Sequence, residues 1–243
     1  MSHRLKSLKV ISFDVTGTLF VHRYPIAHTY AECAQQSKFP VSLSAEMLKK
    51  PFKDAFKQVS IEYPQYGGHH QLSDREWWKQ VIKCTLDNCN ITAYSKDDFE
   101  RYFRKIYQFY GSPDAYELLE DSDCLLKWLE ESKKYSLGIT TNAPYRSIET
   151  MLPMTSTDKY FDWFVCSRDV LADKPDQKVF DEVFRQASFW KPGLQRNEIL
   201  HIGDSWTHDY CGARAAGFQA LWIGTLSCRL CSNNLVLSFC CRS

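Results

Sequence analysis

One short stretch near the amino terminus constrains the fold of this chain more than any other. Residues 8–13 form an apolar run with β-branched and aromatic side chains, as expected of a buried strand, and Asp14 follows directly. A turn that contains Gly17 comes next. Because open parallel sheets gather their chemistry at the carboxyl ends of the strands, Asp14 lies where a catalytic side chain is expected. Aspartate is also a common turn residue, so this stretch by itself does not define a site.

Polar groups follow apolar runs or loops in the same way at three later points of the chain. In order they are Thr141 and Asn142 after residues 137–140, Lys174 after a loop, and Asp204 with Asp209 after residues 199–203. Together with Asp14 they supply a nucleophile, a hydroxyl that binds oxygen, a fixed cation and metal ligands. The pattern therefore predicts one active site, assembled at the edge of a sheet.

This order of motifs resembles the haloacid dehalogenase-like (HAD) hydrolase superfamily, and in particular its capped phosphatase-like branch. The matching motifs extend from about residue 9 to residue 224. The resemblance implies a Rossmann-like α/β core, an all-helical cap inserted between the first and second motifs, and Mg²⁺ as cofactor. It also implies hydrolysis of a small phosphorylated metabolite through an aspartyl-phosphate on Asp14.

The resemblance further implies a role for each motif residue. Asp14 would attack the phosphoryl group, and Lys174 would neutralise charge on Asp14 and on the phosphoryl oxygens. Thr141 would donate a hydrogen bond to a phosphate oxygen, and Asn142 would help to bind and orient the substrate. The metal ligands would be Asp14, the backbone carbonyl of Thr16, Asp204 and, through water or another ligand, Asp209. Alternatively, either of the last two acids caps the helix expected near residue 207.

Thr16 is where the sequence departs from the phosphatases of this superfamily, which usually carry a second Asp two residues after the nucleophile. That acid protonates the leaving oxygen and later activates water, and a threonine hydroxyl does neither well near neutral pH. Loss of such help costs about two to four orders of magnitude in rate. The sequence therefore predicts a slow phosphatase, with a catalytically impaired binding or regulatory protein as one alternative. A 2-haloacid dehalogenase is another, although paired Asp204 and Asp209 favour a metal site.

Residues 22–114 carry no strand pattern as strong as the first run, and they carry helix starts instead. Ser73 has the position of the first residue of a capping box, and Ser95 that of another helix N-cap. An all-helical insertion directly after the nucleophile strand could close on substrate and exclude water during phosphoryl transfer. Within this expected cap, Arg23 and His69 are candidates for binding the substrate anion.

The rest of the chain alternates strand and helix patterns, which predicts a doubly wound parallel α/β sheet covered on both faces. Strands are expected near residues 8–13, 136–141, 162–166, 198–202 and 219–223, and helices near 120–134, 144–152, 176–187 and 207–216. The predicted domains are a discontinuous catalytic core (1–21 and 115–226), a helical cap (22–114) and a cysteine-rich tail (227–243).

Composition limits the partners that this chain is expected to have. Its 243 residues are 44% hydrophobic and 24% charged, as in ordinary globular proteins, with a net charge of +1. We therefore expect no nucleic acid, and no membrane because no apolar segment approaches the roughly 20 residues that span a bilayer. The small phosphorylated substrate is what the resemblance implies. A cytoplasmic location is expected, with nuclear and mitochondrial locations as alternatives, and the sequence leaves the oligomeric state undefined.

The ten cysteines fall into two groups. Six are scattered through regular-looking segments, as expected of reduced thiols that are mostly buried. The other four crowd the tail: Cys228, Cys231, Cys240 and Cys241. Their spacing fits no familiar zinc site well, so an unstructured tail is favoured over zinc binding.

Overall fold

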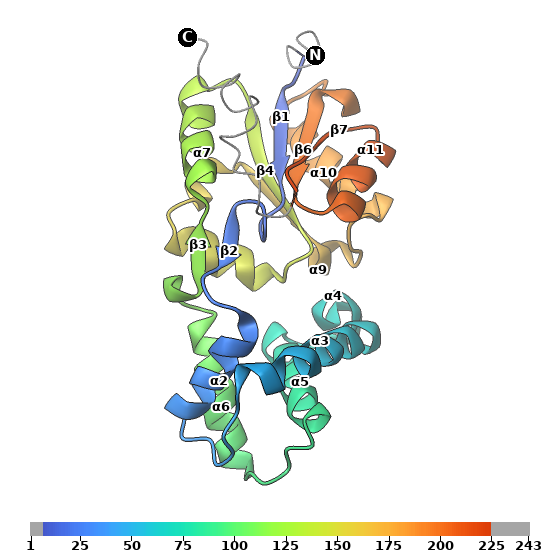
Figure 1. Cartoon of the computed structure of the whole chain (residues 1–243). Helices are drawn as coiled ribbons and strands as arrows, with labels where there is room; N and C mark the ends of the chain where they lie inside the picture. Colours follow the sequence, from blue (N-terminus) through green and yellow to red (C-terminus); the bar gives the residue numbers. More distant parts are fainter. Residues whose placement is uncertain (1–6, 225–243) are drawn as a thin grey trace. The chain divides into compact units, whose positions relative to one another are not determined.

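The computed structural model describes residues 7–224, which form two compact units (Figure 1). The helical unit is His22–Glu117, and the core unit comprises the described residues on either side of it. The sequence predicted that the helical segment would end at residue 114, three residues before the end of this unit at Glu117. The chain passes between the units through β2 (Phe20–His22) and β3 (Tyr116–Leu118), which pair in a two-stranded sheet. The predicted cysteine-rich tail lies outside the described residues.

A five-stranded parallel sheet forms the centre of the core unit, in the order β5-β4-β1-β6-β7. Its strands are β1 (Val10–Phe13), β4 (Ser136–Thr141), β5 (Trp163–Cys166), β6 (Ile199–Gly203) and β7 (Gln219–Trp222). Every residue of β1, β4 and β6 is buried, as expected of parallel strands covered on both faces. The predicted doubly wound α/β fold is confirmed, and the ends of these three strands are neighbours.

Helices cover both faces of this sheet, with α7 on one side and α10 and α11 on the other (Figure 1). The helices of the core unit are α7 (Glu120–Ser132), η3 (Ser147–Met151), α8 (Leu152–Met154), η4 (Asp158–Tyr160), α9 (Ser167–Val170), α10 (Gln177–Trp190), η5 (Arg196–Glu198), η6 (Trp206–Cys211) and α11 (Gly212–Ala215). Val10 of β1 packs in one apolar cluster with Val183 of α10 and Ala213 of α11. Because alternate residues of a strand share a face, Ser12 points to the same side of the sheet.

Two of the helices expected in the core contain π turns. The helix expected at 207–216 begins with η6, in which Tyr210 N–H donates to the carbonyl of Ser205, five residues earlier, at 3.2 Å. The helix expected at 144–152 likewise consists of the π-helix η3 followed by α8. Such wide turns recur at functional sites, and a hydrophobic period of 3.6 residues does not reveal them. Here one of them carries Asp209.

The helical unit is built from amphipathic helices whose apolar faces meet around Trp77, which is 1% exposed. The helices are α2 (Ile26–Gln36), α3 (Ala45–Glu62), α4 (Pro64–Gly67), η1 (Gly68–His70), α5 (Asp74–Asn88), α6 (Lys96–Phe109) and η2 (Pro113–Ala115). The predicted capping box is confirmed, because Ser73 Oγ accepts from Glu76 N and Glu76 Oε2 accepts from Ser73 N. Ser95 and Asp98 cap α6 in the same way. Within residues 7–224, no helix combines the length and the apolar character that crossing a membrane requires.

Candidate active site

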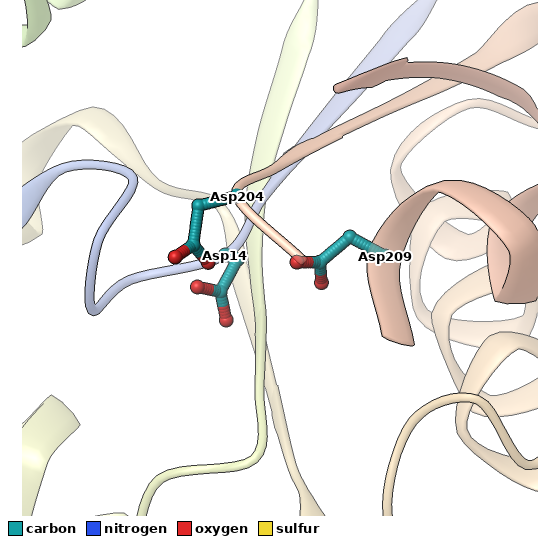
Figure 2. A group of neighbouring side chains, drawn as sticks. All are labelled: Asp14, Asp204 and Asp209. Carbon is teal, nitrogen blue, oxygen red and sulfur yellow. The ribbon is translucent and has the colours of Figure 1, made fainter. Parts of the chain in front are cut away.

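Three carboxylates converge at the carboxyl edge of the sheet in the core unit (Figure 2). Asp14 follows β1, Asp204 follows β6, and Asp209 lies in η6. One oxygen from each lies within 4.8 Å of the oxygens of the other two. The first two acids are 190 positions apart in the chain, and they meet because β1 and β6 pair, with Phe13 opposite Ile202. Asp14 and Asp209 are buried, whereas Asp204 is partly exposed.

The backbone of β6 leaves room for the Asp209 carboxylate. Gly203 ends this strand without a side chain, and a Cβ built there would lie 2.2 Å from Asp209 Cγ. The carboxylate therefore rests against the strand itself. Its Oδ2 accepts a hydrogen bond from Ser205 N at 2.9 Å and so supports the start of η6, but the N-cap is Ser205, whose side chain accepts from His208 N, and neither Asp204 nor Asp209 has that role. Its Oδ1 takes part in the cluster of buried polar groups.

Lys174 lies beside these carboxylates, and its side chain is 1% exposed. Its Nζ donates to Asp14 Oδ1 at 2.8 Å, to Asp209 Oδ1 at 2.6 Å and to the carbonyl of Thr140 at 2.7 Å. Burial disfavours the charged ammonium, but the two carboxylates outweigh this effect and raise the pKa of Lys174. An ammonium has three N–H donors, and all three are used. In this arrangement Lys174 therefore acts through the two carboxylates.

At the end of β4, Asn142 binds the backbone of Lys174 and Thr141 binds the backbone of the neighbouring loop. The side-chain amide of Asn142 brackets the backbone of Lys174, accepting from its N–H at 2.7 Å and donating to its carbonyl at 3.0 Å. Thr141 Oγ1 accepts from Ala143 N at 3.1 Å, and an oxygen that accepts this bond keeps its own proton to donate. Asn142 thus orients Lys174, and Thr141 retains the donor that a phosphate oxygen requires.

The electrostatics of the three acids differ according to their neighbours. Burial, together with the charges of Asp14 and Asp209, raises the pKa of Asp204 to about 6. Burial also opposes ionisation of Asp209, but the hydrogen bond from His201 and the charge of Lys174 hold its pKa well below the usual range. The site thus gathers more carboxylate charge than Lys174 offsets. Three convergent carboxylates with excess negative charge fit a hard divalent cation such as Mg²⁺.

Thr16 lies in the turn between β1 and β2, and it is exposed. Its backbone forms an isolated bridge with Phe20, and the Gly17 N–H donates to the Phe20 carbonyl at 2.7 Å. The hydroxyl that contacts the Asp14 carboxylate belongs to Thr18, which donates to Oδ2 at 3.4 Å. Neither hydroxyl can act as an acid near neutral pH. The slow phosphatase reaction expected from Thr16 therefore stays a prediction.

The two remaining candidates belong to the helical unit. Arg23 donates through Nη2 to the carbonyl of Tyr116 at 3.0 Å. His69 lies in η1 and is exposed. These contacts describe both residues within their own unit, and their assignment to substrate binding remains a prediction.

Besides Thr18, three buried polar residues next to Asp209 were missed by the sequence reasoning. Ser12, Thr140 and His201 are each 0% or 1% exposed and connect to Asp209 by hydrogen bonds. A signal was present in the sequence: each interrupts or ends a run of apolar residues expected to be a buried strand. A polar side chain at such a position requires a buried partner, which the sequence alone does not identify.

Among known proteins, haloacid dehalogenase-like hydrolase domain-containing protein 3 of Bos taurus is similar to this chain. It is 28% identical over 223 residues, which cover 92% of this chain and 84% of that protein. Among solved structures, the HAD-hydrolase YfnB of Bacillus subtilis, described as bound to magnesium, has a TM-score of 0.66 at 18% identity. The alignment with YfnB covers 95% of this chain and 99% of that one.

A second solved structure, a 2-haloacid dehalogenase from Pseudomonas syringae, has a TM-score of 0.58 at 21% identity and covers 88% of this chain and 86% of that one. At these identities both structures show the shared fold alone. The family is shown by the model for haloacid dehalogenase-like hydrolases, which matches residues 8–217. The chain therefore belongs to the haloacid dehalogenase-like hydrolase family.

Proposed function

We propose that this haloacid dehalogenase-like hydrolase is a Mg²⁺-dependent phosphatase that acts on a small phosphorylated metabolite through an aspartyl-phosphate on Asp14. The observation that carries the proposal is the convergence of Asp14, Asp204 and Asp209, with Lys174 in contact with the first and the last. Haloacid dehalogenation uses a similar nucleophile but requires a cradle for halide. A cluster of carboxylates repels a halide ion and favours a metal-dependent reaction.

The chain's own residues supply the nucleophile for the first half of the reaction and fix its position. Lys174 donates to one oxygen of Asp14 and Thr18 to the other, and these two bonds fix the carboxylate that would attack phosphorus. A bond forms from that carboxylate to phosphorus while the bond from phosphorus to the leaving oxygen breaks, and the leaving group departs with the electron pair as an anion because Thr16 supplies no proton. The hydroxyl of Thr141 donates to a phosphoryl oxygen as negative charge grows there.

The carboxylates of Asp14 and Asp204, the backbone carbonyl of Thr16 and, through water, Asp209 would hold Mg²⁺. When bound, Mg²⁺ offsets charge on the phosphoryl oxygens and aligns them with the nucleophile. The insertion of the helical unit directly after the nucleophile strand supports a cap role for it. Arg23 and His69 are then the candidates for contacting the rest of the substrate.

A second candidate, a phosphate-binding or regulatory protein with little turnover, follows from Thr16. The second half of the reaction requires a base that activates water against the aspartyl-phosphate, and Thr16 supplies none. If the aspartyl-phosphate on Asp14 is hydrolysed slowly, the protein would spend much of its time in the phosphorylated state. This property distinguishes the two candidates in an experiment.

The experiment is a panel of aryl, acyl and alkyl phosphates assayed with Mg²⁺ and with a chelator, with Asp14→Asn as the control for contaminating phosphatase. The proposal expects Mg²⁺-dependent release of phosphate that Asp14→Asn abolishes. Turnover retained in a verified Asp14→Asn protein would rule out the mechanism. A single burst of product without further turnover would favour the binding or regulatory protein instead.

A further inference from the structure

A closed ring of hydrogen bonds lies in the core unit directly next to the three acids. Ser12 Oγ lies 2.7 Å from Thr140 Oγ1 and 3.0 Å from His201 Nδ1. His201 Nε2 lies 3.1 Å from Asp209 Oδ1, which accepts from Lys174 at 2.6 Å. Lys174 then closes the ring by donating to the carbonyl of Thr140 at 2.7 Å. All five residues are buried.

The sheet itself creates this ring. Ser12 and His201 are direct partners in the parallel pairing of β1 with β6, so their side chains lie next to each other on one face. Thr140 reaches the same face from β4, the other neighbour of β1. His201 and Gly203 also share a face, and the missing Cβ at Gly203 lets Asp209 approach the imidazole.

The protons in this ring have one consistent order. The Asp209 carboxylate accepts from Lys174, so the imidazole nitrogen that faces it, Nε2 of His201, is the donor of their contact. Nδ1 faces the Ser12 hydroxyl, which can donate as well as accept, so a single imidazole proton serves both contacts when it lies on Nε2. A neutral imidazole with its proton on Nε2 accepts at Nδ1. Ser12 therefore donates to His201 and accepts from the hydroxyl of Thr140.

We propose that His201 is a positioning residue: it carries its proton on Nε2, donates it to Asp209 Oδ1, and so fixes the carboxylate that holds Lys174 against Asp14. His201 reaches no reacting atom by itself; it acts through Asp209. Ser12 and Thr140 set the direction of the donor by occupying Nδ1. The catalytic consequence rests on the proposed phosphatase function, whereas the hydrogen-bond order does not.

The ring matters for Lys174 because Asp209 is the anionic partner that stays in place during the proposed reaction. Asp209 is one of its two anionic partners, and Asp14, the other, has to react. If Asp209 turned away, the ammonium would be held by Asp14 and the Thr140 carbonyl alone. Partners that orient residues around a metal site typically change metal affinity or activity by about 10–100-fold when removed.

The first test measures the tautomer of His201 in the metal-free full-length protein by long-range ¹H–¹⁵N correlation of the histidine side chains. The His201 signals are identified by their absence in His201→Gln. The proposal expects the proton on Nε2 and an unprotonated Nδ1. A proton on Nδ1, or on both nitrogens at neutral pH, would overturn it. This measurement requires neither turnover nor Mg²⁺, so it separates failure of this proposal from failure of the proposed function.

The second test uses two variants, His201→Gln and His201→Asn, each of which replaces the hydrogen bond of one of the two imidazole nitrogens. The amide of Gln extends about as far as Nε2 and keeps a donor for Asp209, whereas the shorter Asn reaches only the position of Nδ1 and Ser12. Each is assayed for kcat and KM on p-nitrophenyl phosphate and for the Mg²⁺-dependent rise in Tm. Leu86→Ala, which removes fully buried apolar atoms from the core of the helical unit, is the control for stability loss alone.

The expected result is a loss of about 10–100-fold in kcat or Mg²⁺ affinity for His201→Asn, with a clearly smaller loss for His201→Gln. Leu86→Ala should lower Tm and leave the Mg²⁺ response at the parent level. Equal losses in the Asn and Gln variants would show that His201 only fills space, and would overturn the proposal. An unchanged Mg²⁺ response and kcat in a folded His201→Asn would overturn it as well.

Discussion

Gly17 lies directly against the carboxylate of Asp204: a Cβ at position 17 would be 2.4 Å from Asp204 Oδ2. The same glycine has φ +89°, a conformation that side chains rarely adopt. The turn after Asp14 and the acid after β6 therefore fit together only because position 17 has no side chain. This close approach brings Asp204 to the turn that carries Asp14 and Thr16.

Gly17→Ala is expected to displace Asp204 and to remove most of the Mg²⁺-dependent rise in Tm. Gly193→Ala is the matched control, because Gly193 also has positive φ, at +79°, but nothing lies within 4 Å of its added Cβ. Both variants should lose about 1 kcal/mol of stability from the backbone strain. Thermal shift with and without Mg²⁺ measures the difference, and an equal Mg²⁺ response in the two variants would contradict the role of this contact.

Lys174→Met is expected to destabilise the protein by about 3–5 kcal/mol, since it leaves Asp14 and Asp209 buried without their cation. Lys178→Met changes an exposed lysine four residues along the same segment and should stay within about 0.5 kcal/mol of the parent. Urea unfolding of the metal-free proteins measures both. A similar midpoint for the two variants would show that the buried ion pairs contribute little.

The raised pKa of Asp204, about 6, predicts how Mg²⁺ binding and stability depend on pH. Since Mg²⁺ requires the carboxylate, its stabilising effect should be full above pH 7 and should fall about tenfold in affinity per pH unit well below pH 6. In the metal-free protein the folded state holds this proton more tightly than the unfolded state. The contribution of Asp204 to stability is therefore present below about pH 4 and lost as pH rises through 6.

Asp204→Asn isolates this contribution. The metal-free variant should be more stable than the parent at pH 7, and the two should converge toward pH 4. Unfolding measured across pH 4–8 gives the difference curve. A difference that does not change with pH would show that Asp204 is not under the repulsion described for Asp14 and Asp209.

Thr16→Asp is expected to raise the rate on alkyl phosphates more than the rate on p-nitrophenyl phosphate. An alkoxide leaving group requires a proton, whereas p-nitrophenolate departs without one. The carboxylic acid of Asp at position 16 can supply this proton, and the hydroxyl of Thr16 cannot. Thr16→Asn, similar in size but without an acid, is the matched control and should show no gain. Vigorous parent activity on an alkyl phosphate, unimproved by Thr16→Asp, would show that another residue supplies the proton.

The local elements of the fold were accessible from the sequence because their signals are local. Apolar runs of four to six residues indicated the strands. The capping box of Ser73 and Glu76 was predictable because both residues lie within one helical turn. The π turn at Asp209 was not accessible, because η6 is only six residues long and a hydrophobic period of 3.6 residues does not reveal one wide turn. The positions of Arg23 and His69 with respect to substrate stay predictions.

The sequence by itself determined which polar groups end which strands: the order of Asp14, Thr141, Lys174 and Asp204 requires only that each follow its apolar run or loop. The tertiary structure decided what these groups contact. His201 and Ser12 meet because β1 lies next to β6, and Asp209 reaches both through the space left at Gly203. The order of the strands, and which side chains become neighbours on one face of the sheet, depend on packing between residues far apart in the chain. Local sequence patterns do not specify these long-range contacts.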